Sequence, residues 1–103
     1  MGTYFKLVIH NAFTKSLNYN LLYYKKNHYN FFFKVIKKAY ASMNILKTFP
    51  YIYTVFYKTN DKEYRKIIIN NYFIIVYYIE NRYVHIIYFF NGRQETQNLF
   101  RIL

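Results

Sequence analysis

Apolar residues at helical intervals predict a first helix near the start of the chain. They follow Tyr4–Ile9, a short segment rich in strand-forming residues that predicts an N-terminal strand. Asn11 stands between the two, where its side chain could cap the helix. The apolar positions of this helix are Phe13, Leu17, Leu21 and Tyr24. The polar segment Lys25–Asn30 interrupts the pattern, and we expect it to connect two helices.

A second helix is predicted by one continuous apolar stripe. Its members are Phe32, Val35, Ile36, Ala39, Met43 and Leu46. Lys34, Lys37 and Lys38 turn mostly away from that stripe. Pro50 ends the helical region, because its ring clashes with the preceding turn of a helix.

The second half of the chain predicts an antiparallel meander. Runs of β-branched and aromatic residues predict strands at Arg65–Asn70, Tyr72–Glu80 and Tyr83–Phe90. A tight turn at Glu80-Asn81 would join the last two strands into a hairpin. The connection before them, Tyr51–Tyr64, could include a short edge strand.

The order of these elements predicts an α+β fold with an N-terminal strand, a two-helix hairpin and a β-meander. Helices segregated on one face of an antiparallel sheet define that class. The 103 residues suit a single domain, which we place at residues 1–103. The tail from Gln94 onward is expected to be a short helix or an extended arm.

Charge narrows the classes of partner. Lys and Arg total 15 against four acidic residues, which gives a net charge of +11. No acidic residue precedes Asp61, whereas nine lysines do. Such a field favours nucleic acid, an anionic membrane surface or an acidic protein as partner. A basic protein that binds no polyanion is the plainer alternative.

Several classes of function are excluded or disfavoured by what the sequence lacks. It has no Cys, which excludes disulfides, thiol catalysis and Cys-based zinc sites. The longest stretch without charge, Ile67–Ile79, is well short of the ~20 apolar residues that a spanning helix needs. The first ten residues do not have the pattern of a signal peptide. We therefore expect a cytoplasmic protein that does not enter membranes.

Enzyme signatures are few. Asp61 and Glu63 stand among lysines in a predicted loop, where solvated charge is the expected role. His10, His28 and His85 occupy unrelated places in the sequence, so we predict no metal site and no cofactor. His85 alone of the three lies inside a predicted strand, where a structural or surface role is the usual one.

Basic and aromatic residues give a stronger signal. Lys58, Lys62, Arg65, Lys66 and Arg93 could gather on one concave face of a twisted sheet and bind phosphates or carboxylates. Three tyrosines, Tyr77, Tyr78 and Tyr88, could stack on unpaired bases. The alternative is that these tyrosines fill the core.

An ordered set of short motifs runs through the second half of the chain. They are Phe49-Pro50, Tyr64-Arg65, Asn71-Tyr72, Tyr77-Tyr78 and Asn91-Gly92-Arg93. With two helices before them, they resemble the RelE/ParE family of toxins from bacterial type II toxin–antitoxin modules. The resemblance implies a growth-inhibiting toxin that a cognate antitoxin neutralises in a hetero-oligomer. No single motif is decisive, and the ordered set carries the resemblance.

The resemblance also implies where partners bind. Lys62, Arg65, Asn91 and Arg93 are the expected target-binding residues. We expect an acidic antitoxin to contact Lys34, Lys37 and Lys38 on the second helix.

The family divides by mechanism, because members like RelE cut mRNA on the ribosome and members like ParE inhibit DNA gyrase. Lys66 and Arg93 match basic catalytic positions of ribonuclease members. However, Phe73 replaces an Arg of those members, and Asn91 replaces the usual His. Leu99 and Phe100 stand where a Tyr or His often occurs in the tail.

These departures make ParE-like gyrase inhibition the preferred hypothesis, since RNA cleavage needs a proton donor and acceptor. A ribosome-dependent mRNA endonuclease is the alternative, with Lys66 and Arg93 as catalytic residues. Whether the protein is an enzyme stays open. A non-toxic, basic nucleic-acid-binding module is a second alternative.

Overall fold

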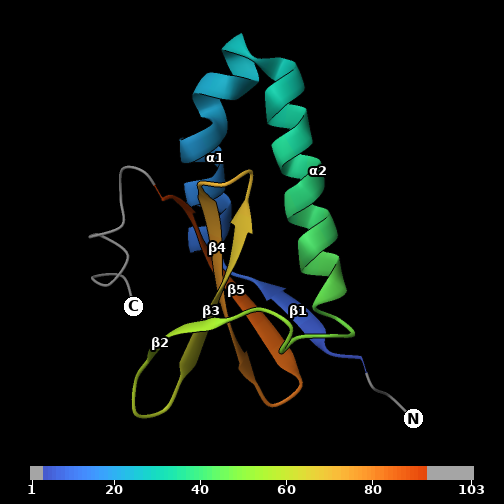
Figure 1. The fold of residues 1–103 in the computed structure, drawn as a ribbon, viewed down its shortest axis with the longest axis vertical. Helices are drawn as coiled ribbons and strands as arrows, with labels where there is room; N and C mark the ends of the chain where they lie inside the picture. Colours follow the sequence, from blue (N-terminus) through green and yellow to red (C-terminus); the bar gives the residue numbers. More distant parts are fainter. Residues whose placement is uncertain (1–3, 93–103) are drawn as a thin grey trace.

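Residues 4–92 fold as a strand, two helices and a four-stranded meander (Figure 1). The computed structural model describes these residues, and residues 1–3 and 93–103 lie outside the described part. The elements are β1 (Lys6–Ile9), α1 (Asn11–Asn27), α2 (Tyr29–Ile45), β2 (Val55–Lys58), β3 (Glu63–Ile69), β4 (Phe73–Glu80) and β5 (Tyr83–Asn91). This order confirms the predicted α+β fold.

The five strands form one mixed sheet in the order β1-β5-β4-β3-β2. Strands β2 to β5 are antiparallel to their neighbours, as the meander predicts. In contrast, β1 adds to the edge of β5 as a parallel strand, with Val8 opposite His85. The chain therefore brings its first strand beside its last one, and the two helices connect β1 to β2 at the opposite edge of the sheet.

The helices cover one face of the sheet. Apolar side chains of both helices, among them Phe13, Val35 and Met43, form a single core with the strands. From α1, Ser16 Oγ accepts a hydrogen bond of 2.9 Å from the amide of Phe89, and Asn20 donates one of 3.1 Å to its carbonyl. These side chains satisfy the edge of β5 beyond the end of β1.

The helix boundaries differ from those that the sequence predicts. Asn11 is the first residue of α1 rather than its cap, and His10 occupies the cap position without a side-chain cap bond. The predicted connection Lys25–Asn30 is largely helical, because α1 continues to Asn27 and α2 begins at Tyr29. This junction projects beyond the strands (Figure 1). In residues 4–92, no helix is long and apolar enough to cross a membrane.

The turns and strand ends agree more closely with the sequence. β2 is the short edge strand within the connection Tyr51–Tyr64. β3 starts at Glu63, two residues before the predicted strand. Asn81 and Arg82 form the turn of the β4–β5 hairpin, since Glu80 pairs with Tyr83. Asn81 has φ of 58°, a conformation that Asn tolerates better than most residues.

Candidate functional site

The sheet has a second face, which points away from the helices. Successive side chains of a strand point to opposite faces, so β3, β4 and β5 each contribute side chains to both faces of the sheet. A second apolar cluster is centred on Tyr64, Val76 and Phe90, and none of its described members is a helix residue. We call this side of the sheet the aromatic face. Its further members used below are Phe56, Lys62, Lys66, Tyr78, His85 and Tyr88.

Two lysines lie over aromatic rings of this face. Lys62 Nζ is 5.3 Å from the centre of the Tyr78 ring, and Lys66 Nζ is 5.6 Å from that of Phe56. Both contacts are within the range of cation–π attraction. Both lysines are half-buried. The aromatic face thus combines positive charge with ring surface, which is the combination that the sequence predicts for nucleic-acid binding.

Arg65 lies on the helix side of the sheet, away from Lys66. Strand alternation alone requires this, because the two residues are neighbours in β3. The Arg65 guanidinium donates hydrogen bonds to the carbonyls of Tyr53 (2.6 Å) and Tyr51 (3.3 Å). Its side chain is only 14% exposed and forms an ion pair with Glu63. The structure therefore gives Arg65 a role in fastening the loop after α2 to β3, and it does not gather all the predicted cations on one face.

The tyrosines divide in the same way. Tyr77 is completely buried on the helix side, where its hydroxyl donates to the carbonyl of Pro50 at 2.8 Å. Tyr78 and Tyr88 belong to the aromatic face and are half-buried. The core interpretation therefore applies to Tyr77, and the other two keep ring surface for a ligand.

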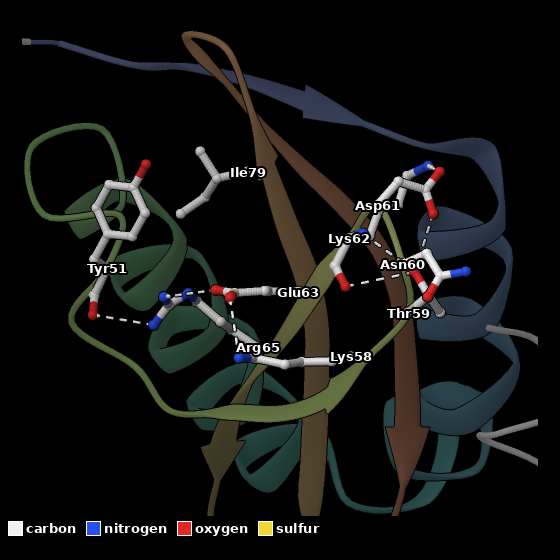
Figure 2. A pocket seen from close by; sticks show the side chains of 9 residues that line it. All are labelled: Tyr51, Lys58, Thr59, Asn60, Asp61, Lys62, Glu63, Arg65 and Ile79. Carbon is white, nitrogen blue, oxygen red and sulfur yellow. Dashed lines mark hydrogen bonds and ion pairs between the residues drawn. The ribbon is translucent and has the colours of Figure 1, made fainter.

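A hollow of about 480 Å³ lies beside the β2–β3 loop (Figure 2). Its lining is Tyr51, Lys58, Thr59, Asn60, Asp61, Lys62, Glu63, Arg65 and Ile79. Each acidic side chain here already pairs with a cation, for instance Glu63 with Lys58 at 3.4 Å and Asp61 with Lys62 at 3.9 Å. Because charge in the hollow is largely balanced, it suits an anionic substrate less well than the aromatic face does.

Two histidines meet at the β1–β5 edge of the aromatic face. His10 Nε2 lies 2.9 Å from His85 Nδ1, a hydrogen-bond distance. The ring of Tyr78 stacks on that of His85, with centres 4.6 Å apart and planes 10° apart. Burial and the neighbouring charge of His85 lower the pKa of His10 below its usual value. Burial also raises the pKa of Tyr78, with the charge of Lys62 opposing the rise.

The sequence gives no signal for this pair. His10 and His85 are separated by 75 positions, and they meet because β1 adds in parallel to β5. Val8 is opposite His85, so His10, two residues further on, is on the same face. Only the pairing of these two strands could have revealed the pair.

The predicted target-binding residues do not converge. Asn91 pairs with Phe73 at one end of β4, whereas Tyr64, beside Lys62 and Arg65, pairs with Tyr78. The two places are five residues apart along β4, roughly 16 Å at the rise of a strand. Arg93, the remaining member of the set, lies outside the described residues.

Gly92 explains how the chain leaves β5. Its amide donates a hydrogen bond of 2.6 Å to the carbonyl of Tyr72. A Cβ at this position would lie 2.8 Å from that oxygen and 3.0 Å from Ile74 Cδ1. The glycine thus permits a close approach of two backbones, which is a packing requirement of the β3–β4 turn.

The three lysines predicted to bind an antitoxin are all exposed on α2. Lys37 Nζ lies 5.6 Å from the ring centre of Phe33 on the same helix. Lys38 donates a hydrogen bond of 2.8 Å to Asn70 Oδ1, so it also ties α2 to the β3–β4 turn. Lys34 and Lys37 are therefore the better candidates for a partner's carboxylates.

Within the described ranges, no group of three or more His, Asp or Glu side chains could hold a metal ion. Comparisons with known proteins give no further guide to the site. No protein-family model matches this sequence, and no curated protein matches it.

Proposed function

We propose that the protein is the toxin of a type II toxin–antitoxin module and that it acts on RNA through the aromatic face. The observation that carries this proposal is the placing of Lys62, Lys66, Tyr78 and the His10–His85 pair on one side of the sheet. Unpaired RNA bases are recognised by stacking on aromatic side chains, and phosphates by nearby cations. The order strand, two helices and meander is also what the family resemblance implies.

The His10–His85 pair favours RNA over DNA gyrase as the target. The preference for a ParE-like action rests on the lack of a visible proton donor and acceptor, and two adjacent imidazoles are suited to that task. Lys66 faces the same side of the sheet, as a residue that stabilises charge would.

Inhibition of DNA gyrase is the second candidate. It is favoured by Phe73, which replaces an arginine of ribonuclease members and is completely buried in the core beneath the helices. This position therefore supplies no cation to the aromatic face. Both targets are cytoplasmic, and we expect the protein to act there.

Induced expression of the chain in bacterial cells separates the two targets. We expect rapid loss of full-length mRNA, with new 5′ ends mapped inside codons. A DNA-damage response with intact mRNA would instead support gyrase inhibition and would overturn the RNA proposal. The matched pair of variants is Lys62→Ala with Lys66→Ala on the aromatic face, against Lys47→Ala, an exposed lysine after α2. Only the first should protect the mRNA.

A non-toxic nucleic-acid-binding module makes a different prediction. Such a module would bind generic single-stranded RNA tightly by itself and would not arrest growth. Binding by either kind of protein weakens with salt, and loss of Lys62 and Lys66 should lower the slope of log K against log salt by about 1.4. Growth arrest on expression decides between the toxin and the module.

The proposed antitoxin should carry an acidic segment that covers α2. Charge pairing with Lys34 and Lys37 would mostly speed association and fix its register. An acidic open reading frame adjoining the gene is the expected source. When the antitoxin is co-expressed, the Lys34→Glu/Lys37→Glu variant of the toxin should escape neutralisation and arrest growth. The control variant Lys15→Glu/Lys26→Glu, on α1, should still be neutralised. Equal neutralisation of both would place the antitoxin elsewhere.

A further inference from the structure

The outward nitrogens of the His10–His85 pair are available to a ligand. The pair uses His10 Nε2 and His85 Nδ1 for its mutual hydrogen bond. No other residue of the described chain forms a hydrogen bond with His10 Nδ1 or His85 Nε2. Both side chains are half-buried at the end of β1 and within β5. The two rings thus present one free nitrogen each.

A neutral pair of this kind always exposes one base and one acid. Each neutral imidazole carries one N–H, so one ring must donate the shared hydrogen bond and the other must accept it. If His10 donates, its Nδ1 is a base and His85 Nε2 carries a proton outward. If His85 donates, the two roles are exchanged. Either tautomer can accept one proton and release another.

The surroundings favour the neutral pair and an anionic ligand. Burial and the charge of His85 lower the pKa of His10, which favours its neutral form, and Lys62 Nζ lies over the Tyr78 ring that stacks on His85. His10 also occupies the N-cap position of α1, where the helix dipole favours a nearby anion. Tyr83 is another titratable side chain near the pair, with its ring centre 6.4 Å from that of His85, and it lies opposite Lys6 of β1. The negative charge of Glu80 on β4 contributes to the raised pKa of Tyr78.

We propose that the His10–His85 pair is the proton-transfer centre for cleavage of RNA at a ribose 2′-hydroxyl. This inference rests on the proposed action on RNA, and it names the residues that would perform the reaction. The base nitrogen takes the 2′-O–H proton, and the 2′ oxygen forms a bond to phosphorus. The bond from phosphorus to the 5′ oxygen breaks, and the acid nitrogen gives its proton to that oxygen.

The proton balance closes within the pair. The shared proton crosses the 2.9 Å hydrogen bond as the outer protons are gained and lost, so the pair ends in its other tautomer. The products are a 2′,3′-cyclic phosphate and a 5′-hydroxyl, and no oxidant, metal or further reactant is needed. Lys62, over the neighbouring Tyr78 ring, is the cation that we expect to offset the charge that develops on the phosphate oxygens.

The test compares His10→Gln and His85→Gln with His28→Gln in a translating extract supplied with a defined mRNA. Glutamine keeps hydrogen-bonding capacity but cannot transfer protons at neutral pH. His28 lies at the junction of α1 and α2, so it is the matched control. We expect His10→Gln and His85→Gln each to slow cleavage by about 10²–10⁴-fold, and His28→Gln to cleave at the normal rate. The unaltered protein should leave 2′,3′-cyclic phosphate ends.

Two outcomes would overturn the proposal in distinguishable ways. If the unaltered protein cuts RNA and folded His10→Gln and His85→Gln cut it equally fast, the proton-transfer role fails while the proposed function stands. If the unaltered protein cuts no RNA, the proposed function fails and this inference fails with it.

A second measurement does not depend on whether the variants fold well. A pair that must be neutral loses activity when it takes up an additional proton. The cleavage rate of the unaltered protein should therefore rise with pH to a plateau, with a midpoint below the usual histidine value of about 6.5. A bell-shaped profile would indicate two independent groups, one charged and one neutral, and would contradict the shared-proton mechanism.

Discussion

The hydroxyl of Tyr77 donates a hydrogen bond of 2.8 Å to the carbonyl of Pro50 inside the core. The bond joins the centre of β4 to the loop that follows α2, and Arg65 of β3 donates a further hydrogen bond to the same loop. Both contacts lie on the helix side of the sheet. The side chains that hold this loop are therefore not those of the aromatic face. Stability and function can be tested with separate substitutions.

Tyr77→Phe should lower the free energy of unfolding by about 1–2 kcal/mol, because a buried carbonyl loses its donor. Urea denaturation measures the change. Tyr40→Phe, on the exposed side of α2, is the matched control and should change stability by less than ~0.5 kcal/mol. An equal effect of the two substitutions would mean that the hydrogen bond does not stabilise the loop.

Alkaline pH should weaken the same contact. Burial raises the pKa of Tyr77 to about 12, although the charge of Arg65 offsets part of the rise. This pKa in the folded protein lies above the unfolded value of about 10. The contribution of Tyr77 to the free energy of unfolding is therefore complete below pH 10 and is lost as pH rises towards 12. The midpoint of urea unfolding, measured between pH 9 and 12, should fall more steeply for the unaltered protein than for Tyr77→Phe. Parallel curves would contradict this assignment.

Arg65→Ala should destabilise the protein by about 1.5–3 kcal/mol, since hydrogen bonds from a charged donor to two carbonyls are lost. Arg82→Ala removes an exposed guanidinium that lies 5.5 Å from the Phe5 ring centre, and it should cost at most about 1 kcal/mol. Thermal unfolding of both variants measures this difference in stability. If Arg65→Ala keeps full stability but loses toxicity, the residue binds the target, as the sequence suggests.

Gly92→Ala should destabilise the fold by about 1–3 kcal/mol. The added methyl group would meet the carbonyl oxygen of Tyr72 at 2.8 Å, and backbone cannot move aside as a flexible side chain can. Chemical denaturation gives the magnitude. Unchanged stability would indicate that the end of β5 shifts freely away from the β3–β4 turn.

Stability should also fall in mild acid because of His10. Its pKa is lowered in the folded protein by burial and by the charge of His85. A depressed folded pKa means that unfolding takes up a proton, so stability is lost as pH falls from about 6.5 through the folded pKa. The melting temperature between pH 7.5 and 5 should drop more for the unaltered protein than for His10→Gln. A larger drop in the variant would reverse the sign of the expected shift.

Local patterns of residues were sufficient to predict the type and order of the elements. Helical spacing of apolar residues marked both helices, and runs of β-branched and aromatic residues marked the strands of the meander. These patterns are local, because each element must present an apolar side whatever it packs against. Asn81 likewise acts locally, through the left-handed conformation that it tolerates in the hairpin turn. The boundaries within Lys25–Asn30 were misjudged because its exposed polar side chains suit the outer side of a helix as well as a loop.

Which side chains share a face, and which strands lie side by side, depends on tertiary packing. Alternation separates Arg65 from Lys66, but it does not say which of them faces the helices. The parallel pairing of β1 with β5 joins segments about 75 positions apart, and no local pattern encodes it. Burial of Leu7 and Ile86 against the helices selects that pairing, and it carries His10 to His85. The proposed site is thus a consequence of how the core closes.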